Sequence, residues 1–365
     1  MPKTIPVSDT VIVGNELKYL KECVDSRWVS SLGPFVGKFE KAVADYCGVK
    51  YSNSVCNGTA ALHVALLAAG IKNGDEVIVP NCTFVSTANA AAFCNAKPVF
   101  VDVDPNTWNI DVSLIENAIT ENTKAIIPVD IFGCPAEYDE INRAAKEHGL
   151  FVLEDSAEAL GATYKGKPAG SLGDAGVFSF YGNKIITSGE GGMVVSDDKD
   201  FIDKVDILKD QGKSSEKKFY HDVLGYNFRF SNLQAAFALA QFEGIDKLLK
   251  KKREIAKHYT DLLSGIDGIR LQEIPNHVES SYWFVSAVLE EPFPSAERVG
   301  AMLKGKGIDS RPFFTPMSEL PFYNSRGSFP VSSMLAERGM SLPSGASLKG
   351  EEIELVCKAL LECRQ

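Results

Sequence analysis

The stretch Leu150-Phe-Val-Leu-Glu-Asp155-Ser-Ala-Glu158 shows the pattern that decides the fold of this 365-residue chain. Its first four residues are apolar on consecutive positions, which fits a strand that is buried on both faces of a parallel sheet. The strand ends in carboxylates, and ligands of open α/β sheets sit at the carboxyl ends of strands. We therefore predict a buried strand that presents acidic side chains to a binding site.

Similar apolar runs recur between residues 48 and 200. The clearest are Glu76-Val-Ile-Val-Pro80, Pro98-Val-Phe-Val-Asp102, Lys124-Ala-Ile-Ile-Pro128 and Gly192-Met-Val-Val-Ser196. Helix patterns at 60–69 and 137–148 lie between such runs, and each is followed by a glycine, a common residue at a helix C-terminus. This βα order predicts an α/β protein whose mostly parallel central sheet is flanked by helices.

The character of the chain changes after about residue 235. A long charged helix pattern runs through Lys247 and Arg253, and a strand-like segment follows at 282–289. We predict a large domain at 1–240 and a smaller C-terminal α/β domain at 241–365. The N-terminal segment, about 1–30, is expected to pack near the smaller domain.

The composition of the chain argues against several kinds of protein. The chain is 45% hydrophobic and 24% charged, as in globular proteins, and its net charge is −10 with no basic run, which argues against a nucleic-acid partner. Eight dispersed cysteines without a CxxC pair, and no leader sequence, predict reduced thiols in the cytoplasm. Apolar stretches are too short for a membrane span. The five histidines show no metal-ligand spacing, so we expect no metal.

A first candidate site segment is Val55-Cys-Asn-Gly-Thr-Ala60, where a strand-like run meets the start of a helix. Free N–H groups and the positive end of the helix dipole favour a phosphate at such a junction, and Gly58 lets the backbone approach it closely. The alternative is that Thr59 only caps the helix.

The carboxylates after the strand at 150–153 form the second candidate site. A carboxylate such as Asp155 could keep a ring nitrogen of a cofactor protonated, which turns a pyridine ring into an electron sink. The alternatives are an acid that caps the next helix or binds a metal.

The third segment is Gly173-Asp-Ala-Gly-Val-Phe-Ser179-Phe-Tyr-Gly-Asn-Lys184-Ile-Ile-Thr-Ser-Gly-Glu-Gly-Gly192. Its glycines indicate tight turns or a close approach to another group. Lys184 lies between two strand-like runs with no acidic neighbour in sequence. Such packing fits an amine whose pKa is lowered for Schiff-base chemistry, whereas a lysine is ordinarily a surface residue.

Together these segments resemble the DegT-type (DegT/DnrJ/StrS) sugar aminotransferases, a fold-type I family that depends on pyridoxal 5'-phosphate (PLP). The resemblance covers nearly the whole chain. The matching stretches are Trp28-Val-Ser-Ser-Leu-Gly33, Asn57-Gly-Thr59, Gly74-Asp-Glu-Val-Ile-Val-Pro80, Glu154-Asp-Ser-Ala-Glu-Ala-Leu-Gly161, Gly173-Asp174, the Lys184 segment and Gly225-Tyr-Asn-Phe-Arg229.

The resemblance implies roles for individual residues. Lys184 would form the Schiff base with PLP and then move the proton between the amine donor and the cofactor, and Asp155 would pair with the ring nitrogen. The remaining cofactor contacts implied are Phe84 against the ring, Glu158 near the 3'-hydroxyl, Gly58, Thr59 and Ser179 at the phosphate, and Asn227 at the phosphate of a neighbouring subunit. A homodimer with shared active sites is therefore expected.

The resemblance also implies the substrates. A lysine at position 184 favours amino transfer over removal of a sugar hydroxyl, with L-glutamate as the donor. Several stretches most resemble family members that aminate GDP-4-keto-6-deoxymannose, and dTDP- or UDP-linked keto sugars are the alternative. Trp28, Ser30, Ser31 and Arg311 are expected substrate contacts, although Arg311 could equally form a structural salt bridge.

Two positions depart from the pattern of those members. Asp130 and Ser318 stand where histidines are usual, and both are expected near the sugar. Two other kinds of protein are disfavoured by the sequence. A nicotinamide-dependent dehydrogenase is disfavoured because this chain has no GxGxxG between a first strand and helix. A non-enzymatic PLP-binding regulator is disfavoured by the set Lys184, Asp155 and Glu158.

Overall fold

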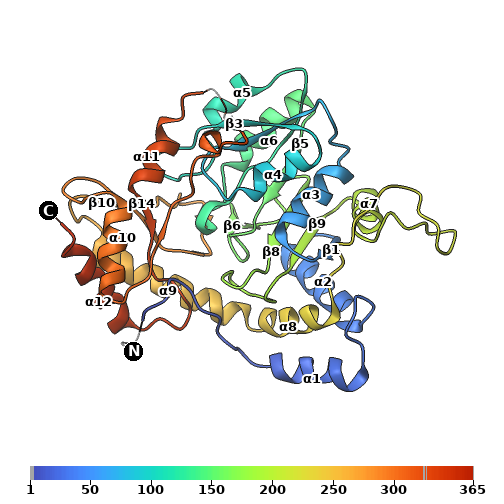
Figure 1. Ribbon diagram of the computed structural model, residues 1–365, viewed down its shortest axis with the longest axis horizontal. Coiled ribbons are helices and arrows are strands. Elements are labelled where there is room, and N and C mark those ends of the chain that lie inside the picture. The colour runs from blue at the N-terminus through green and yellow to red at the C-terminus, as the bar shows by residue number, and fades with distance from the viewer. Residues whose placement is uncertain (1–3, 324, 326, 365) are drawn as a thin grey trace.

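The computed structural model describes residues 4–323, 325 and 327–364 (Figure 1). Its helices are α1 (Glu16–Ser26), α2 (Pro34–Cys47), α3 (Gly58–Ala68), α4 (Ser86–Phe93), α5 (Ile115–Ala118), α6 (Tyr138–His148), α7 (Lys199–Lys209), α8 (Asn232–Phe242), α9 (Ile245–Leu263), α10 (Ala296–Gly305), α11 (Pro330–Arg338) and α12 (Gly350–Leu361). Its strands are β1 (Tyr51–Val55), β2 (Glu76–Pro80), β3 (Lys97–Val101), β4 (Thr123–Ile126), β5 (Phe151–Asp155), β6 (Thr163–Tyr164), β7 (Lys167–Pro168), β8 (Ala175–Ser179), β9 (Gly192–Ser196), β10 (Ile269–Leu271), β11 (Val278–Glu279), β12 (Ser286–Leu289), β13 (Arg311–Pro312) and β14 (Gly339–Ser341).

The central sheet has seven strands in the order β1-β9-β8-β5-β4-β2-β3. Pairing is parallel from β8 through β5, β4 and β2 to β3, whereas β9 runs antiparallel to both of its neighbours. The predicted α/β architecture is thus confirmed, with one reversed strand that makes the sheet mixed. Because β1 runs in the same direction as β8, six strands (β1, β2, β3, β4, β5 and β8) end on the same edge as Asp155.

The strands form where consecutive apolar residues predicted them. β2 and β9 match the predicted ranges, and both are buried along their whole length. Alternate residues of a strand pack on opposite faces. Val77 and Val79 of β2 lie in the core shared with α3, while Ile78 lies in the core shared with α6. Burial on both faces therefore accounts for the unbroken apolar runs.

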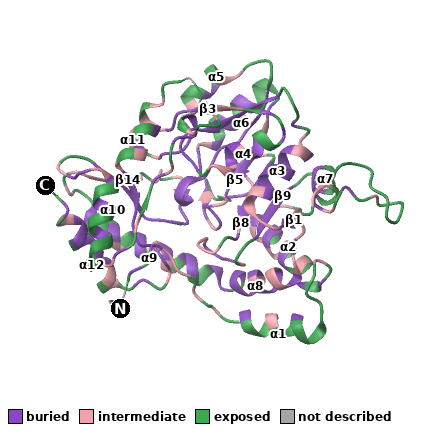
Figure 2. Ribbon diagram, in the orientation of Figure 1, coloured by how far each residue is buried: buried purple, intermediate pink, exposed green. Residues whose placement is uncertain are grey.

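Helices cover both faces of this sheet, as Figure 1 shows. The apolar core on one face is built with α3, α4 and α7, and the other face packs against α2, α6 and α8. Helix α6 ends at His148, and Gly149 follows in the left-handed conformation at φ 64°, which confirms its predicted C-terminal glycine. Figure 2 shows the burial concentrated between these layers.

The C-terminal part of the chain forms a four-stranded antiparallel sheet in the order β10-β12-β14-β13. Its own apolar core is built with α9, α10 and α12. Ile5 pairs with Ile308 beside this sheet, while α1 packs along α8. The division of the chain at residue 240 stays a prediction, and residues 1–3 of the predicted N-terminal segment lie outside the described residues.

Among the described helices, none combines the length and apolarity that a membrane crossing requires. All eight cysteines are free thiols, and seven of them are buried.

Candidate active site

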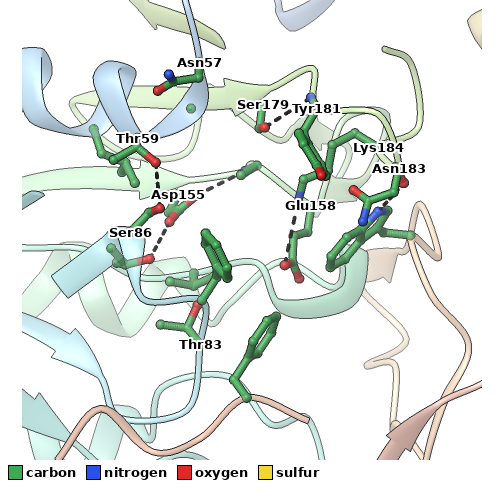
Figure 3. Close-up of a pocket in the computed structure, with 18 of the residues that line it drawn as sticks. Asn57, Thr59, Thr83, Ser86, Asp155, Glu158, Ser179, Tyr181, Asn183 and Lys184 are labelled. Carbon is green, nitrogen blue, oxygen red and sulfur yellow. Dashed lines mark hydrogen bonds and ion pairs between the residues drawn. The ribbon is translucent and has the colours of Figure 1, made fainter. Parts of the chain in front are cut away.

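A cavity of about 570 Å³ opens where five of these six strands, β1, β2, β4, β5 and β8, end (Figure 3). That volume is typical of a small-molecule site. It is lined by Asn57, Gly58, Thr59, Leu62, Thr83, Phe84, Ser86, Thr87, Val129, Asp155, Ala157, Glu158, Ser179, Tyr181, Asn183, Lys184, Glu190, Trp283, Arg311 and Phe314. The strand ends bring together the segments that the sequence analysis singled out.

Asp155 is the last residue of β5, and its carboxylate is held from two sides. The Thr87 hydroxyl donates to Oδ2 at 2.7 Å, and the backbone N–H of Ala157 donates to Oδ1 at 3.2 Å. The side chain is 4% exposed, and this burial raises the pKa of its carboxyl. A cationic group bound in the cavity would restore the charged carboxylate, because an adjacent positive charge favours it.

Lys184 lies on the turn after β8, and its amine projects toward Glu158 (Figure 3). Nζ lies 3.7 Å from Glu158 Oε1 and 3.7 Å from the centroid of the Trp283 ring. Burial lowers the pKa of the Lys184 amine, and the charges of Glu158 and Asp155 oppose that shift. The sequence analysis predicted an amine with a lowered pKa but overlooked its acidic partner in space.

Glu158 is fully enclosed beside this lysine. Its Oε2 accepts the backbone N–H of Phe132 at 2.8 Å. Burial raises the pKa of Glu158 to about 7, against the opposing effect of Lys184. The raised pKa of Glu158 and the lowered pKa of Lys184 bring the proton affinities of the two groups closer together, which suits a site that moves protons.

The N-terminus of α3 provides the opposite end of the cavity. Asn57 caps this helix by accepting the N–H of Ala60 at 2.8 Å, so Thr59 lies inside the helix and is not its cap. The Thr59 hydroxyl instead lies 2.6 Å from that of Ser86. A Cβ at position 58 would come within 2.9 Å of Ser179 Cβ. Glycine is thus required for Ser179 to face the helix terminus.

Several predicted site residues lie outside this cavity. Asn227 is exposed beyond α7, and its backbone bridges to Asp210. Trp28 and Ser30 contact Asn232 through their carbonyl oxygens, at 2.6 Å to Nδ2 and 2.8 Å to the backbone N–H. Trp28, Ser30 and the nearby Ser31 do not line the cavity of this chain.

Arg311 and Phe84 do line the cavity. The Arg311 guanidinium forms no ion pair within the described part of the chain, and it lies 5.6 Å from the ring centroid of Phe284. The structural salt bridge considered as its alternative role is therefore absent from the described residues. The Phe84 ring is 55% exposed and lies 6.0 Å from that of Phe314.

The expectation that Asp130 and Ser318 lie near the sugar needs correction. Neither lines the cavity. Asp130 is fully buried and accepts from the hydroxyls of Tyr138, at 2.9 Å, and Ser156, at 2.8 Å. The Ser318 N–H donates to Asn81 Oδ1 at 2.9 Å. Asp130 lies directly before the 3-10 turn at Ile131–Gly133 and Ser318 within the one at Met317–Glu319, and both residues are buried in the packing around the site.

The sequence analysis missed several lining residues. Thr87 lies three residues after Phe84, which was predicted from the sequence, and its position after a strand end could have pointed to it. Trp283 lies a hundred residues after Lys184 and sits in a strand-like apolar segment, so only the fold reveals it. No group of His, Cys, Asp or Glu among the described residues has the arrangement of a metal site.

Comparison with known proteins agrees with this geometry. The profile of the DegT/DnrJ/EryC1/StrS aminotransferase family matches residues 11–361. The chain is 43% identical to GDP-perosamine synthase of Escherichia coli O157:H7, covering 99% of this chain and 98% of that protein. It is 41% identical to GDP-perosamine synthase of Vibrio cholerae, with 98% of each chain covered. The PLP form of Spr1654 from Streptococcus pneumoniae superposes with a TM-score of 0.92 at 27% identity, over 98% of this chain and 97% of that one. The chain belongs to the DegT/DnrJ/EryC1/StrS aminotransferase family.

Proposed function

We propose that this chain is a PLP-dependent aminotransferase that converts GDP-4-keto-6-deoxymannose into GDP-perosamine, with L-glutamate as the amine donor. The observation that carries the proposal is the enclosed amine of Lys184 between Glu158 and Asp155 in a cavity at the strand ends. The family membership supports amino transfer, and the two GDP-perosamine synthases support the GDP-linked sugar.

The lining residues fit PLP in three separate respects. Lys184 offers an amine to a carbonyl cofactor, and the fixed carboxylate of Asp155 offers an acceptor to a protonated ring nitrogen. The N-terminus of α3, with Gly58 and the hydroxyls of Thr59 and Ser179, offers donors to a phosphate. The aromatic face of Phe84 is free to stack on a ring. We propose these residues as the cofactor site.

When bound, PLP supplies an electron sink that makes a C–H bond of an attached amine acidic. The chain's own residues then handle the proton. Lys184 would take it from Cα of the donor and return it to the cofactor carbon, because no other amine among the described residues lines the cavity. Asp155 would keep the ring nitrogen protonated, and Glu158 would hold the charge of the Lys184 ammonium.

The cavity of one chain has little positive charge for the anionic ligands proposed for it. Lys184 and Arg311 are its lining cations, against the carboxylates of Asp155, Glu158 and Glu190. A phosphate and a nucleotide diphosphate bring at least four further negative charges, which these cations cannot balance. We propose a homodimer, the assembly that the family resemblance implies, in which the neutral side-chain amide of Asn227 of one copy donates to the phosphate held by the other.

Exposed apolar residues mark surfaces that such a partner could cover. One surface lies on α1 and the residues directly after it and comprises Leu17, Val24, Trp28, Val29 and Leu32. The other lies on the segment after α7 and comprises Phe219, Val223 and Leu224. Trp28, Ser30 and Ser31 would contact substrate in the neighbouring site, while Arg311 would bind an anionic group of the substrate in its own. The cytoplasmic location stays a prediction.

A substrate panel tests the proposal. Purified protein with PLP and L-glutamate is incubated with GDP-, dTDP- and UDP-linked 4-keto-6-deoxy sugars, and products are identified by mass spectrometry. Amination of the GDP-linked sugar alone is expected. Amination of only a dTDP- or UDP-linked sugar would overturn the sugar assignment and keep the aminotransferase. Amination of none would favour a non-enzymatic PLP-binding regulator.

A further inference from the structure

The indole of Trp283 contacts the Lys184 segment at two points. The face of the ring lies 3.7 Å from Lys184 Nζ, measured to the ring centroid. The edge of the ring donates through Nε1 to the carbonyl oxygen of Asn183 at 2.7 Å. One side chain thus fixes both the amine of the lysine and the turn that carries it.

Trp283 is itself held firmly. Its side chain is buried, and its carbonyl oxygen accepts from the buried amine of Lys252 at 2.7 Å. The segment passes so close to Gly133 that a Cβ there would lie 3.0 Å from the backbone nitrogen of Trp283. Gly133 follows Phe132, whose N–H holds Glu158. The loop at Phe132 and Gly133 therefore helps to position both groups that contact the lysine amine, Glu158 and Trp283.

The ring face is a direct neighbour of that amine. Nζ forms no hydrogen bond within the described part of the chain, and the nearest carboxylate oxygen, on Glu158, is 3.7 Å away. The charged groups that act on it are Glu158 and Asp155, which favour the ammonium, and Arg311, which disfavours it. An indole face attracts a cation, and at partly desolvated sites this favours the protonated amine by about 2- to 30-fold.

We propose that Trp283 is a positioning residue for Lys184, whose ring face holds the ammonium beside the cavity whenever the lysine is not bound to the cofactor. The proposal rests on the function assigned to Lys184 above. The proton taken from the donor would then stay at a fixed point, and the ring edge would keep the turn from moving while the amine is free. The C-terminal part of the chain thereby contributes to proton transfer as well as to closing the cavity.

Fluorinated tryptophans separate this electrostatic role from a packing role, since they keep the shape of the ring and withdraw negative charge from its face. Tryptophans with increasing numbers of fluorines are incorporated at position 283 and, as a matched control, at the buried Trp108. In full-length protein stripped of cofactor, the rate of acylation of Lys184 by acetic anhydride is measured against pH by mass spectrometry of its peptide. Only the unprotonated amine reacts.

The midpoint of this titration is expected to fall stepwise with fluorination at 283, by up to about 1.5 pH units, and to stay constant with fluorination at 108. A constant midpoint at 283, or an equal shift at 108, would overturn the proposal. This readout needs no sugar substrate, so it is independent of whether the chain aminates the GDP-linked sugar.

Two substitutions extend the test to the bound cofactor. W283F keeps an aromatic face but loses the bond to Asn183, and W283L loses both. The rate constant of the glutamate half-reaction is expected to decrease in the order wild type, W283F, W283L, by about 2- to 30-fold overall. F293L, which removes a buried ring in the C-terminal core away from the cavity, controls for lost stability. A W283L rate equal to that of F293L would contradict the proposal.

Discussion

Two groups of buried acids lie on opposite sides of the end of β5. Asp155 and Glu158 face the cavity and Lys184. Glu154 points away from the cavity, where it meets Asp130 through the Ser156 hydroxyl, at 2.5 Å and 2.8 Å respectively. The four acids are buried to a similar degree, and three of them, Glu154, Asp155 and Glu158, lie within five residues along one strand and turn.

The two groups differ in how their charge is compensated. The cavity side has a lysine amine, whereas no lysine or arginine pairs with Asp130 or Glu154 among the described residues. Glu154 accepts instead from the backbone N–H groups of Gly170, at 2.5 Å, and Leu172, at 2.8 Å. Asp155 and Glu158, beside Lys184, thus suit proton movement, whereas Glu154 and Asp130 hold β5 in place.

Asp130 and Glu154, which have no cationic partner among the described residues, must retain a proton between them. The Ser156 hydroxyl has a single proton and cannot donate to both Asp130 and Glu154 at once. Burial and the charge of Glu154 raise the pKa of Asp130 well above its ordinary value. We infer that Asp130 carries the extra proton, so that the group has one negative charge instead of two.

The largest expected effect comes from the cavity side. K184A should lower turnover by at least about 10⁴-fold, the upper end of what a general acid–base residue contributes, while the fold is retained. Steady-state assays with glutamate and the GDP-linked sugar measure the loss, and circular dichroism checks the fold. Steady-state transfer near the wild-type rate would contradict the role of Lys184.

D155N should have the next largest effect. The amide keeps the shape of the side chain but loses the charge that pairs with a ring nitrogen, and truncated buried charge pairs lose about 30- to 5,000-fold. The glutamate half-reaction, followed by stopped-flow absorbance, is the measurement. An unchanged rate would mean that Asp155 is structural, like its neighbour Glu154.

These expectations rest on a fold that the sequence predicted in outline. Consecutive apolar residues located the strands, and glycines located the helix ends. The direction of β9 could not be predicted, because a strand buried on both faces has the same pattern whichever way it runs. The positions of two side chains could not be predicted either. The surroundings of Asp130 depend on the direction in which its side chain points, and the role of Trp283 depends on contact with Asn183, 100 residues earlier in the chain.

E154Q is expected to lower the stability of the folded protein more than it lowers the reaction rate. One backbone N–H that now donates to the carboxylate, from Gly170 or Leu172, would face an amide NH₂ instead. An unpaired buried donor costs about 1 to 3 kcal/mol. Urea unfolding should show a loss of that size, and the glutamate half-reaction of the folded enzyme should change far less than in D155N. A large loss of rate at unchanged stability would reverse the assignment of the two sides.

D130N should have the smallest effect, and one that depends on pH. Its NH₂ can donate to Ser156, which then donates to Glu154, so stability near pH 6 should stay within about 1 kcal/mol of the wild type. Unfolded Asp130 loses its proton near pH 4 whereas folded Asp130 keeps it, so this proton's contribution is complete below pH 4 and decreases as pH rises toward the folded pKa.

The asparagine variant has no such proton. Its stability relative to the wild type should therefore increase from pH 6 to pH 9, measured by urea unfolding at each pH. A difference that is constant across this range would show that Asp130 is ionised in the folded protein, and that the side without a cation holds two charges.

The central claim is that Lys184, and no other lysine, binds the cofactor at the cavity side of β5. Holoenzyme is treated with borohydride, which fixes the carbon–nitrogen double bond between PLP and its lysine, and the digested peptides are analysed by mass spectrometry. We predict that the reduced cofactor is found on the peptide containing Lys184 and is absent in K184A. Cofactor attached to a different lysine, such as the buried Lys252, or retained covalently in K184A, would contradict the account.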